Sequence, residues 1–173
     1  MRVRAVMFVG VLLLAAAVLA ANAGAAGKKT AAACTLKAAV TISPGISNTA
    51  SSGTFGSTSG TINCAGTVGG RTATGKAGSL SLSGTYGPDT CATGKGQGTF
   101  SATVPTNTGT LSVTGSFKYT RVGAGGNFTG SASDGLGDTS TIRGAFTFQP
   151  TSGTCATKPA TKANVNGGAA LQG

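Results

Sequence analysis

The sequence predicts an all-β protein, a small antiparallel up-and-down barrel held together by disulfides. Three observations support this fold class. Apolar and polar residues alternate in short runs rich in threonine, valine and phenylalanine, glycine and proline separate those runs, and no convincing helical period follows the N-terminal apolar stretch. A two-sheet β-sandwich is the alternative, because the same alternation suits both architectures.

Composition narrows the class of protein further. Only 9% of the 173 residues are charged, 30 are glycine, and the chain has no histidine and no tryptophan. This composition differs from that of disordered chains, which are rich in charge, and from that of helical proteins, which are rich in alanine, glutamate, lysine and leucine. The length suits a single domain.

The first 23 residues predict a cleaved secretory signal peptide. Two arginines precede an unbroken apolar run, and small residues follow it up to Ala23. The alternatives are an uncleaved N-terminal membrane anchor and a lipidated cell-surface protein, acylated at Cys34. We expect a secreted, extracellular bacterial protein in which 24–33 is a flexible segment, 34–157 is a single β domain and 158–173 is a disordered tail.

The first two expected strands form a hairpin. Residues 34–43 place Cys34 and four apolar side chains on one face, and Pro44-Gly45 ends the strand. After a long loop, residues 55–68 form the second strand. It ends at Gly69-Gly70, a strong hairpin turn because both positions can adopt a positive φ.

Five further strands repeat the alternation, with apolar or aromatic side chains on one face and mainly serine, threonine or lysine on the other. They cover residues 79–86, 98–104, 110–121, 127–133 and 141–149. Pro105 ends the fourth strand, and 134–138 is a turn between the last two. A closed antiparallel barrel needs an even number of strands, so an eighth is expected near Cys155 or around Phe55.

Glycine precedes most aromatic residues by two positions. The pairs are Gly53 and Phe55, Gly84 and Tyr86, Gly98 and Phe100, Gly115 and Phe117, Gly126 and Phe128, and Gly144 and Phe146. Residues two apart in a strand share a face, so glycine and ring both point into the core. We favour a packing role, in which a ring covers a glycine on a neighbouring strand of a tightly curved interior, over a row of stacked rings that binds a ligand.

Four cysteines in an exported chain predict two disulfides. A hairpin centred near residues 48–49 brings Cys34 opposite Cys64, and Cys91 and Cys155 both follow strands that run in the same direction. We therefore expect the pairs Cys34–Cys64 and Cys91–Cys155, each adding roughly 2–4 kcal/mol of stability. Metal binding is disfavoured because the chain has no C-x-x-C pair and no histidine. No cofactor is expected.

No catalytic site is expected either. Nucleophilic catalysis usually needs histidine or a close substitute. Two-carboxylate chemistry would have to use Asp89, Asp134 and Asp138, whose glycine-rich surroundings are typical of turns. The leading hypothesis is a secreted non-enzymatic protein with a structural or binding role at or beyond the bacterial cell surface. An aspartate-based hydrolase is the remote alternative.

The charge balance suggests partners for such a protein. Without the signal peptide, 11 basic residues outnumber 3 acidic ones, for a net charge of about +8. The basic residues are scattered, which predicts weak binding to polyanions, such as anionic cell-wall polymers, or to a membrane surface. Specific nucleic-acid binding would need clustered positive charge with interleaved aromatic residues. A monomer is expected.

The alternative function is that of a small-molecule carrier that uses the barrel interior. Such a carrier needs a cavity lined by apolar side chains from several strands. The residues expected to line it are Leu82, Phe100, Phe117 and Phe146.

Overall fold

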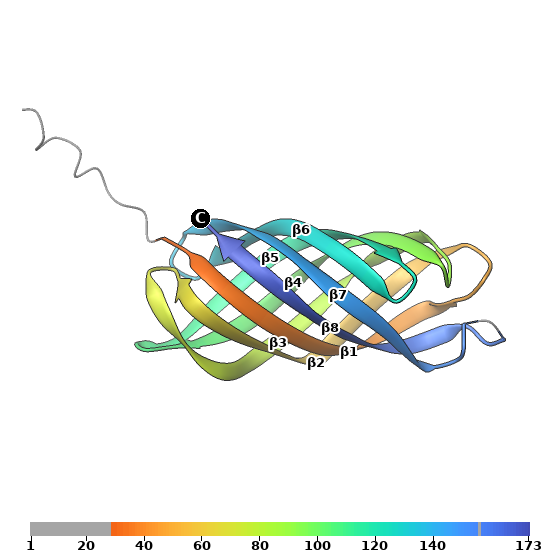
Figure 1. The fold of residues 1–173 in the computed structure, drawn as a ribbon, viewed down its shortest axis with the longest axis horizontal. Helices are drawn as coiled ribbons and strands as arrows, with labels where there is room; N and C mark the ends of the chain where they lie inside the picture. Colours follow the sequence, from red (N-terminus) through yellow and green to blue (C-terminus); the bar gives the residue numbers. More distant parts are fainter. Residues whose placement is uncertain (1–28, 156) are drawn as a thin grey trace, which may run out of the picture.

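A computed structural model describes residues 29–155 and 157–173, which form a closed barrel of eight antiparallel strands (Figure 1). Each strand pairs with the next in sequence, and β8 pairs with β1 to close the barrel. The strands are β1 (Ala31–Ile46), β2 (Ser51–Val68), β3 (Arg71–Asp89), β4 (Thr93–Thr106), β5 (Gly109–Val122), β6 (Gly125–Asp134), β7 (Thr139–Ser152) and β8 (Ala160–Gln172). The predicted barrel is confirmed. The expected signal peptide lies outside the described residues.

The C-terminal residues form a strand, so the prediction of a disordered tail at 158–173 is wrong. β8 pairs with β1 along one edge and with β7 along the other. These two ladders satisfy its backbone hydrogen bonds, which orders a segment made mostly of alanine, glycine and asparagine, all weak strand formers. The eighth strand expected near Cys155 therefore begins five residues after it, at Ala160.

β1 extends beyond both of its predicted limits. Residues 31–33, expected to be flexible, pair with β2 and with β8. At the other end the strand passes Pro44-Gly45 and reaches Ile46, which pairs with Ala160. Proline is tolerated here because the register against β8 shifts between Thr41 and Ile46, and such irregularities leave a position without a ladder hydrogen bond.

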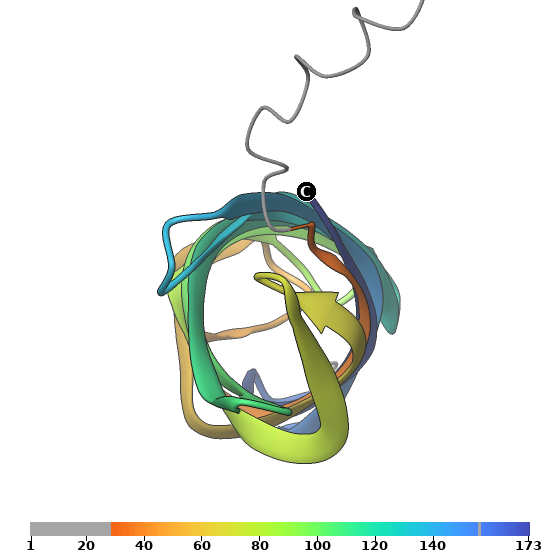
Figure 2. The same cartoon turned by 90° about the vertical axis from the view of Figure 1, so that its left-hand side faces the viewer.

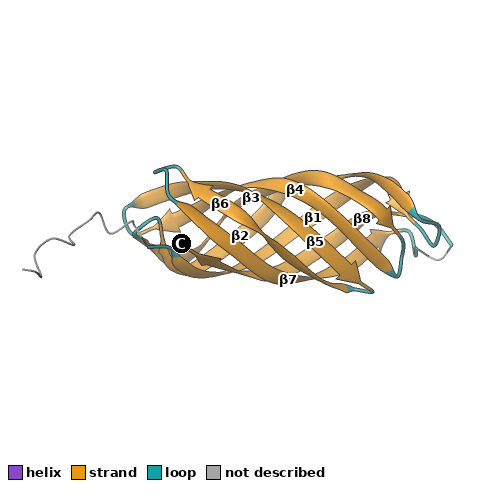
Figure 3. Cartoon of the chain, turned by 90° about the horizontal axis from the view of Figure 1, so that it is seen from above, coloured by secondary structure: helices purple, strands orange, loops and turns teal. Residues whose placement is uncertain are grey.

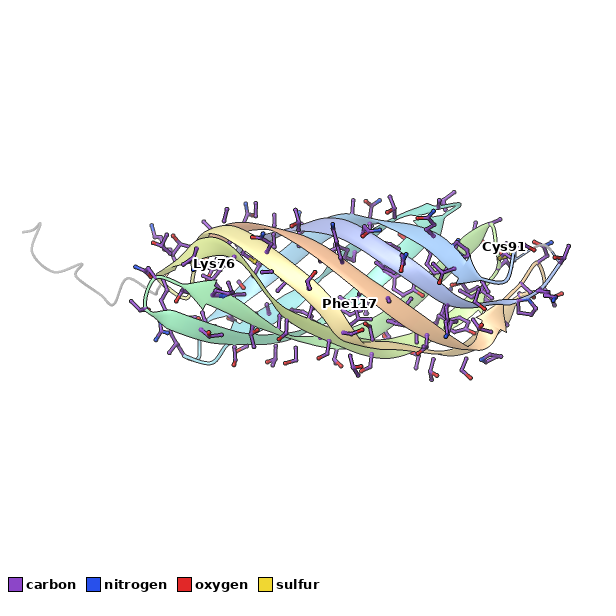
Figure 4. The ribbon with its side chains drawn as sticks, turned by 90° about the horizontal axis from the view of Figure 1, so that it is seen from below. Lys76, Cys91 and Phe117 are labelled. Carbon is purple, nitrogen blue, oxygen red and sulfur yellow. A yellow bond between two sulfur atoms is a disulfide. The ribbon has the colours of Figure 1, made fainter. Side chains whose placement is uncertain are left out.

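Both predicted disulfides are present. Cys34 lies directly opposite Cys64 in the β1–β2 ladder, with 4.0 Å between their Cα atoms. Cys91 and Cys155 join the β3–β4 loop to the β7–β8 loop. Disulfides are typical of proteins that fold in an oxidising compartment. Figure 4 places Cys91 at one end of the barrel and Lys76 at the other, and we name the two ends after these residues.

The β2–β3 hairpin folds across the Lys76 end of the barrel (Figure 2). Val68 next to its turn is only 1% exposed, and the Gly69 N–H donates a hydrogen bond to Thr30 Oγ1. Gly69 packs so closely on the β5 side that an added Cβ would lie 3.2 Å from the Leu111 side chain. Gly69 and Gly70 both have positive φ, as the predicted turn requires.

The strands run almost the full length of the molecule, with loops only at the two ends (Figure 3). Along each strand, side chains alternate between the barrel interior and the outside. On β5, Leu111 and Val113 are buried and the intervening Ser112 and Thr114 are exposed. Buried apolar residues form one cluster around the Cys34–Cys64 disulfide and a second around Tyr86. These clusters surround the space in which the candidate site lies.

Candidate functional site in the barrel lumen

The barrel encloses a cavity of about 150 Å³, which we call the lumen cavity. All four residues predicted to line an interior site border it, and they come from four strands. These residues are Leu82 on β3, Phe100 on β4, Phe117 on β5 and Phe146 on β7. Phe117 lies between the two ends of the barrel (Figure 4). The rings are partly exposed although they face inward, because they border empty volume.

The cavity exists because most rings lie against the wall and leave the centre open. Seven aromatic residues each sit directly across a strand pair from a glycine. The pairs are Tyr86 and Gly53, Phe55 and Gly84, Phe100 and Gly115, Phe117 and Gly98, Tyr119 and Gly96, Phe128 and Gly144, and Phe146 and Gly126. At six of these glycines an added Cβ would lie 3.0 Å or less from a ring carbon of the residue opposite, and at Gly53 it would lie 2.7 Å from the Tyr86 hydroxyl. The predicted packing role of the glycines is thus confirmed.

Five of the rings form a continuous row along the lumen. Neighbouring centroids lie 6.3 Å apart between Phe55 and Phe117, 5.8 Å between Phe55 and Tyr119, and 5.8 Å between Tyr119 and Phe146. Phe128 extends the row beyond Phe146. These distances are in the range of favourable edge-to-face and tilted contacts. The row that covers the glycines therefore also presents an aromatic surface to the cavity, so the two interpretations of the glycine-aromatic spacing are compatible.

A buried ion pair forms the polar end of the lumen cavity, near the Cys91 end. Arg121 on β5 and Asp89 at the end of β3 both border the cavity, and they are only 3% and 1% exposed. Arg121 Nη2 lies 2.6 Å from Asp89 Oδ1, and the guanidinium carbon lies 4.9 Å from the centre of the Phe148 ring. The pair joins two strand ends that are 32 residues apart in sequence.

The sequence interpretation missed this pair. The surroundings of Asp89 in the sequence are typical of a turn, and Arg121 is one of the scattered basic residues that no motif sets apart. The signal that could have found Arg121 is strand parity, because it lies on the same face of β5 as Phe117 and Tyr119. The signal for Asp89 is weaker. It ends a strand beside Gly87-Pro88, where composition alone favours a turn.

Burial changes the protonation behaviour of this end of the lumen. It raises the pKa of Asp89 above its ordinary value of 3.8, and the Arg121 guanidinium opposes that rise. Burial also raises the pKa values of Tyr119 and Tyr86. The negative charge of the nearby Asp89 carboxylate raises the pKa of Tyr119 further. Both tyrosines are therefore neutral phenols at neutral pH. The Tyr86 hydroxyl donates its hydrogen bond to the Pro44 carbonyl.

We expect stability to fall as the pH rises above 10. Tyr86 and Tyr119 have raised pKa values in the folded state, so above their ordinary value of 10.0 the unfolded chain loses protons that the folded barrel keeps. Ionisation then favours unfolding. Urea unfolding at pH 8, 10 and 11 measures the effect. In a Tyr119→Phe variant the loss of stability between pH 10 and 11 should be smaller, and an unchanged loss would contradict this assignment.

The remaining aspartates lie away from the lumen cavity. Asp134 and Asp138 flank the β6–β7 turn at the Lys76 end, and Asp134 Oδ1 accepts hydrogen bonds from the backbone N–H groups of Leu136 and Asp138. Neither borders the lumen cavity, and Asp89 is engaged with Arg121. The structure thus does not bring two aspartates together around that cavity. Among residues 29–155 and 157–173, no group of three metal-ligating side chains is positioned to hold a metal ion.

A second hollow lies on the outer wall over β3, β4, β5 and β6. Exposed serine, threonine and glutamine side chains line most of it, and Lys118 is its one basic residue. Other exposed basic residues are spread over different strands, such as Lys37 on β1, Arg143 on β7 and Lys162 on β8. The outer wall thus presents hydroxyl groups with dispersed positive charge, and the predicted binding of polyanions stays a prediction.

Comparisons with protein families, curated proteins and solved structures find no match to this chain. Within the part of the chain that the structure describes, no helix is long and apolar enough to cross a membrane. Functional inference therefore rests on the lumen, its lining and the buried ion pair at its end.

Proposed function

We propose that this protein is a secreted, non-enzymatic binding protein that carries a small, largely apolar molecule in its barrel lumen. The observation that carries the proposal is the lumen cavity, bordered by the row of aromatic rings. Eight-stranded barrels have an interior that side chains either fill completely or leave open for one small ligand. Here the glycines opposite the rings keep the rings at the wall, which favours the second arrangement.

The size of the cavity limits the ligand. An apolar protein cavity of about this volume stays dry and takes a molecule the size of benzene. Burial of such a molecule against aromatic and aliphatic side chains is favourable because it removes apolar surface from water. A ligand of one ring with a small substituent therefore suits the lumen better than a lipid or a sugar.

Two further features support the rest of the proposal. The two disulfides suit an oxidising compartment outside the cytoplasm, in agreement with the expected signal peptide. The exposed faces of the strands carry mainly serine, threonine, asparagine and lysine, which suit contact with water. Binding of cell-wall polymers by the dispersed basic residues is a compatible property of the same protein, and salt-sensitive attachment to isolated cell walls would test it.

The β2–β3 hairpin is the expected route into the lumen. β3 pairs with β4 at Ala73 and again from Leu80 onward, and the register shifts in between. The opposite end is held by the Cys91–Cys155 disulfide and by the hydrogen bond from Cys91 N–H to the Ser47 carbonyl. Opening the hairpin breaks hydrogen bonds, such as those of Gly69 with Thr30 and of Thr72 with Asn107, whereas opening the Cys91 end strains a covalent disulfide.

Filling the lumen tests the proposal. Ala169 on β8 faces the cavity, and its neighbour Ala170 faces outward and is exposed. We expect Ala169→Leu to weaken toluene binding at least tenfold, because the larger side chain occupies the space that the ligand needs. Ala170→Leu is the matched control and should bind as the unmodified protein does. Isothermal titration and ligand-induced shifts in melting temperature measure both.

Two outcomes would contradict the proposal. One is that the unmodified protein binds no ring-sized apolar molecule at millimolar concentration. The other is that Ala169→Leu and Ala170→Leu bind toluene equally well, which would place the ligand on the outside. Circular dichroism and melting temperatures verify that both variants fold.

A further inference from the structure

The hollow on the outer wall is a furrow between two rows of polar side chains, and we call it the outer furrow. Its volume of about 650 Å³ lies within the range of ligand-binding clefts. The floor is bare backbone, because the residues between the two rows are glycines and Phe117, whose ring faces the lumen. Since Phe117 lies between the two ends of the barrel (Figure 4), the furrow crosses the hydrogen-bonded strands and not the mobile loops.

One wall of the outer furrow is a row of hydroxyl groups. Four exposed residues form it as successive cross-strand partners, Ser83 on β3, Thr99 on β4, Ser116 on β5 and Ser131 on β6. Their hydroxyl groups are paired at long distances, 3.5 Å between Ser83 and Thr99 and 3.4 Å between Ser116 and Ser131. A hydroxyl group can both donate and accept hydrogen bonds, so this wall suits a ligand that is itself rich in hydroxyl groups.

The other wall adds donors for an anion. It consists of Thr85, Gln97, Lys118 and Thr129, all exposed and again successive partners on β3 to β6. Gln97 and Lys118 lie directly opposite each other, and the side chains of such a pair start about 5 Å apart. The amide N–H groups of one and the ammonium of the other can therefore donate to the two oxygens of one carboxylate.

A second cation extends this wall on the next strand. Arg143 on β7 is exposed and lies directly opposite Thr129. Two strand spacings, roughly 10 Å, thus separate it from Lys118 along the row. The arrangement provides two positive charges that one extended ligand can contact, and a small anion cannot reach both.

Negative charge is absent from the outer furrow. The chain has only three acidic residues, and none of them lines it. Asp89 is paired with Arg121 inside the barrel, and Asp134 and Asp138 flank the β6–β7 turn at the Lys76 end. Among the described residues Lys118 forms no salt bridge. The furrow and its border are therefore complementary in charge to an anionic ligand.

The composition of the furrow narrows the class of ligand. Protein interfaces are enriched in aromatic residues and methionine and depleted in serine and lysine, which is the reverse of what lines the furrow. Nucleic-acid sites need clustered positive charge and exposed rings, whereas Phe117, the one aromatic residue here, faces the lumen. A hydroxyl-rich chain with spaced negative charges matches both walls.

We propose that the outer furrow binds an acidic polysaccharide, a chain of sugars that carry carboxylate groups. Its hydroxyl groups bond to the row from Ser83 to Ser131, and its carboxylates bond to Gln97, Lys118 and Arg143. This site is separate from the lumen and goes beyond the proposed carrier function. Each hydrogen bond gains little in competition with water, so affinity depends on several contacts along one chain.

Tetragalacturonate and its fully methyl-esterified form are matched probes, because they differ only in the charge of the carboxyl groups. With the full disulfide-bonded protein at pH 7 and physiological salt, we expect the ester to bind at least tenfold more weakly, the effect of losing a hydrogen bond between charged groups. In NMR titrations the acid should shift the backbone amides of Gln97, Lys118 and Thr129, and leave those of Lys37 and Lys162 unchanged. Inorganic polyphosphate, which has charge but no sugar hydroxyl groups, should show no preference for the furrow.

Variants of equal charge test the position of the site. Lys118→Gln should weaken tetragalacturonate binding about tenfold, and Lys37→Gln, at an exposed lysine on β1, should bind as the unmodified protein does. Adding Arg143→Gln to Lys118→Gln should weaken binding further, whereas Lys37→Gln with Lys162→Gln should not. Substitutions at exposed positions rarely unfold a domain, and melting temperatures verify that all four variants fold.

Three outcomes would overturn this inference. Equal losses from Lys118→Gln and Lys37→Gln would assign the binding to dispersed positive charge. Equal binding of the acid and its ester, or no binding of either, would exclude recognition of carboxylates. Selective shifts of the furrow amides by polyphosphate would exclude a polysaccharide as the required class. Toluene binding is measured on the same samples, and its absence would count against the carrier function alone.

Discussion

Replacing Arg121 with methionine is expected to lower the free energy of unfolding by about 3–5 kcal/mol, the cost of removing one partner from a buried ion pair. Methionine matches much of the length of the arginine side chain but cannot neutralise Asp89, which is 1% exposed. It also leaves the carbonyl oxygens of Cys91 and Gly123 without the hydrogen bonds that Arg121 donates. Urea unfolding at pH 7 with the disulfides intact measures the loss.

Arg143→Met is the matched control, because Arg143 is exposed on β7. Its effect should stay within about 0.5 kcal/mol, as for most surface substitutions. The double variant Asp89→Leu with Arg121→Met should recover the part of the loss that comes from the unpaired Asp89 charge, but not the part that comes from the lost hydrogen bonds to the backbone carbonyls. A loss from Arg121→Met as small as that from Arg143→Met would show that the pair contributes nothing.

Replacing Gly84 with alanine is expected to cost about 3 kcal/mol, which is at the upper end for overpacking a core. An added Cβ at this position would lie 2.6 Å from Phe55 Cζ and 2.7 Å from Gly98 Cα, and it would also collide with the Gln97 carbonyl. The ring could turn away, but the backbone of β4 would have to move as well. Thermal and urea unfolding of the purified variant measure the cost.

Gly56→Ala provides the matched control on the neighbouring strand. An added Cβ there would meet only the Leu82 carbonyl, at 3.5 Å, which is an ordinary contact. Alanine also reduces the conformational entropy of the unfolded chain, so we expect an unchanged or slightly higher stability. Equal destabilisation by both substitutions would contradict the view that Phe55 and β4 make Gly84 necessary.

The sequence predicted the barrel wall well, because the wall depends on local patterns. Alternation with a period of two indicates which side chains face inward, and Gly69-Gly70 marked a turn that the structure contains. Strand parity also placed Cys34 opposite Cys64. The spacing of glycine and aromatic residues predicted that rings would cover glycines, although it could not say which glycine each ring would cover. That choice depends on the register between strands.

Only part of the candidate site could be predicted. Leu82, Phe100, Phe117 and Phe146 were expected to face the interior, and they border the lumen cavity. The ion pair was missed, because whether a charged side chain is buried depends on finding a partner. Arg121 finds its partner 32 residues away in sequence, at the end of β3, which is separated from β5 by β4 in the barrel wall. No local pattern encodes that meeting.

By itself, then, the sequence determined the all-β class, the inward face of seven strands, the positions of several turns and the pairing of four cysteines. Tertiary structure alone decided three other features. It ordered β8, whose small side chains carry little signal but whose backbone is hydrogen-bonded to β1 and β7. It buried Asp89 with Arg121, and it left the lumen cavity open. Each of these depends on how separate strands meet when the barrel closes, whereas alternation is a property of a single strand.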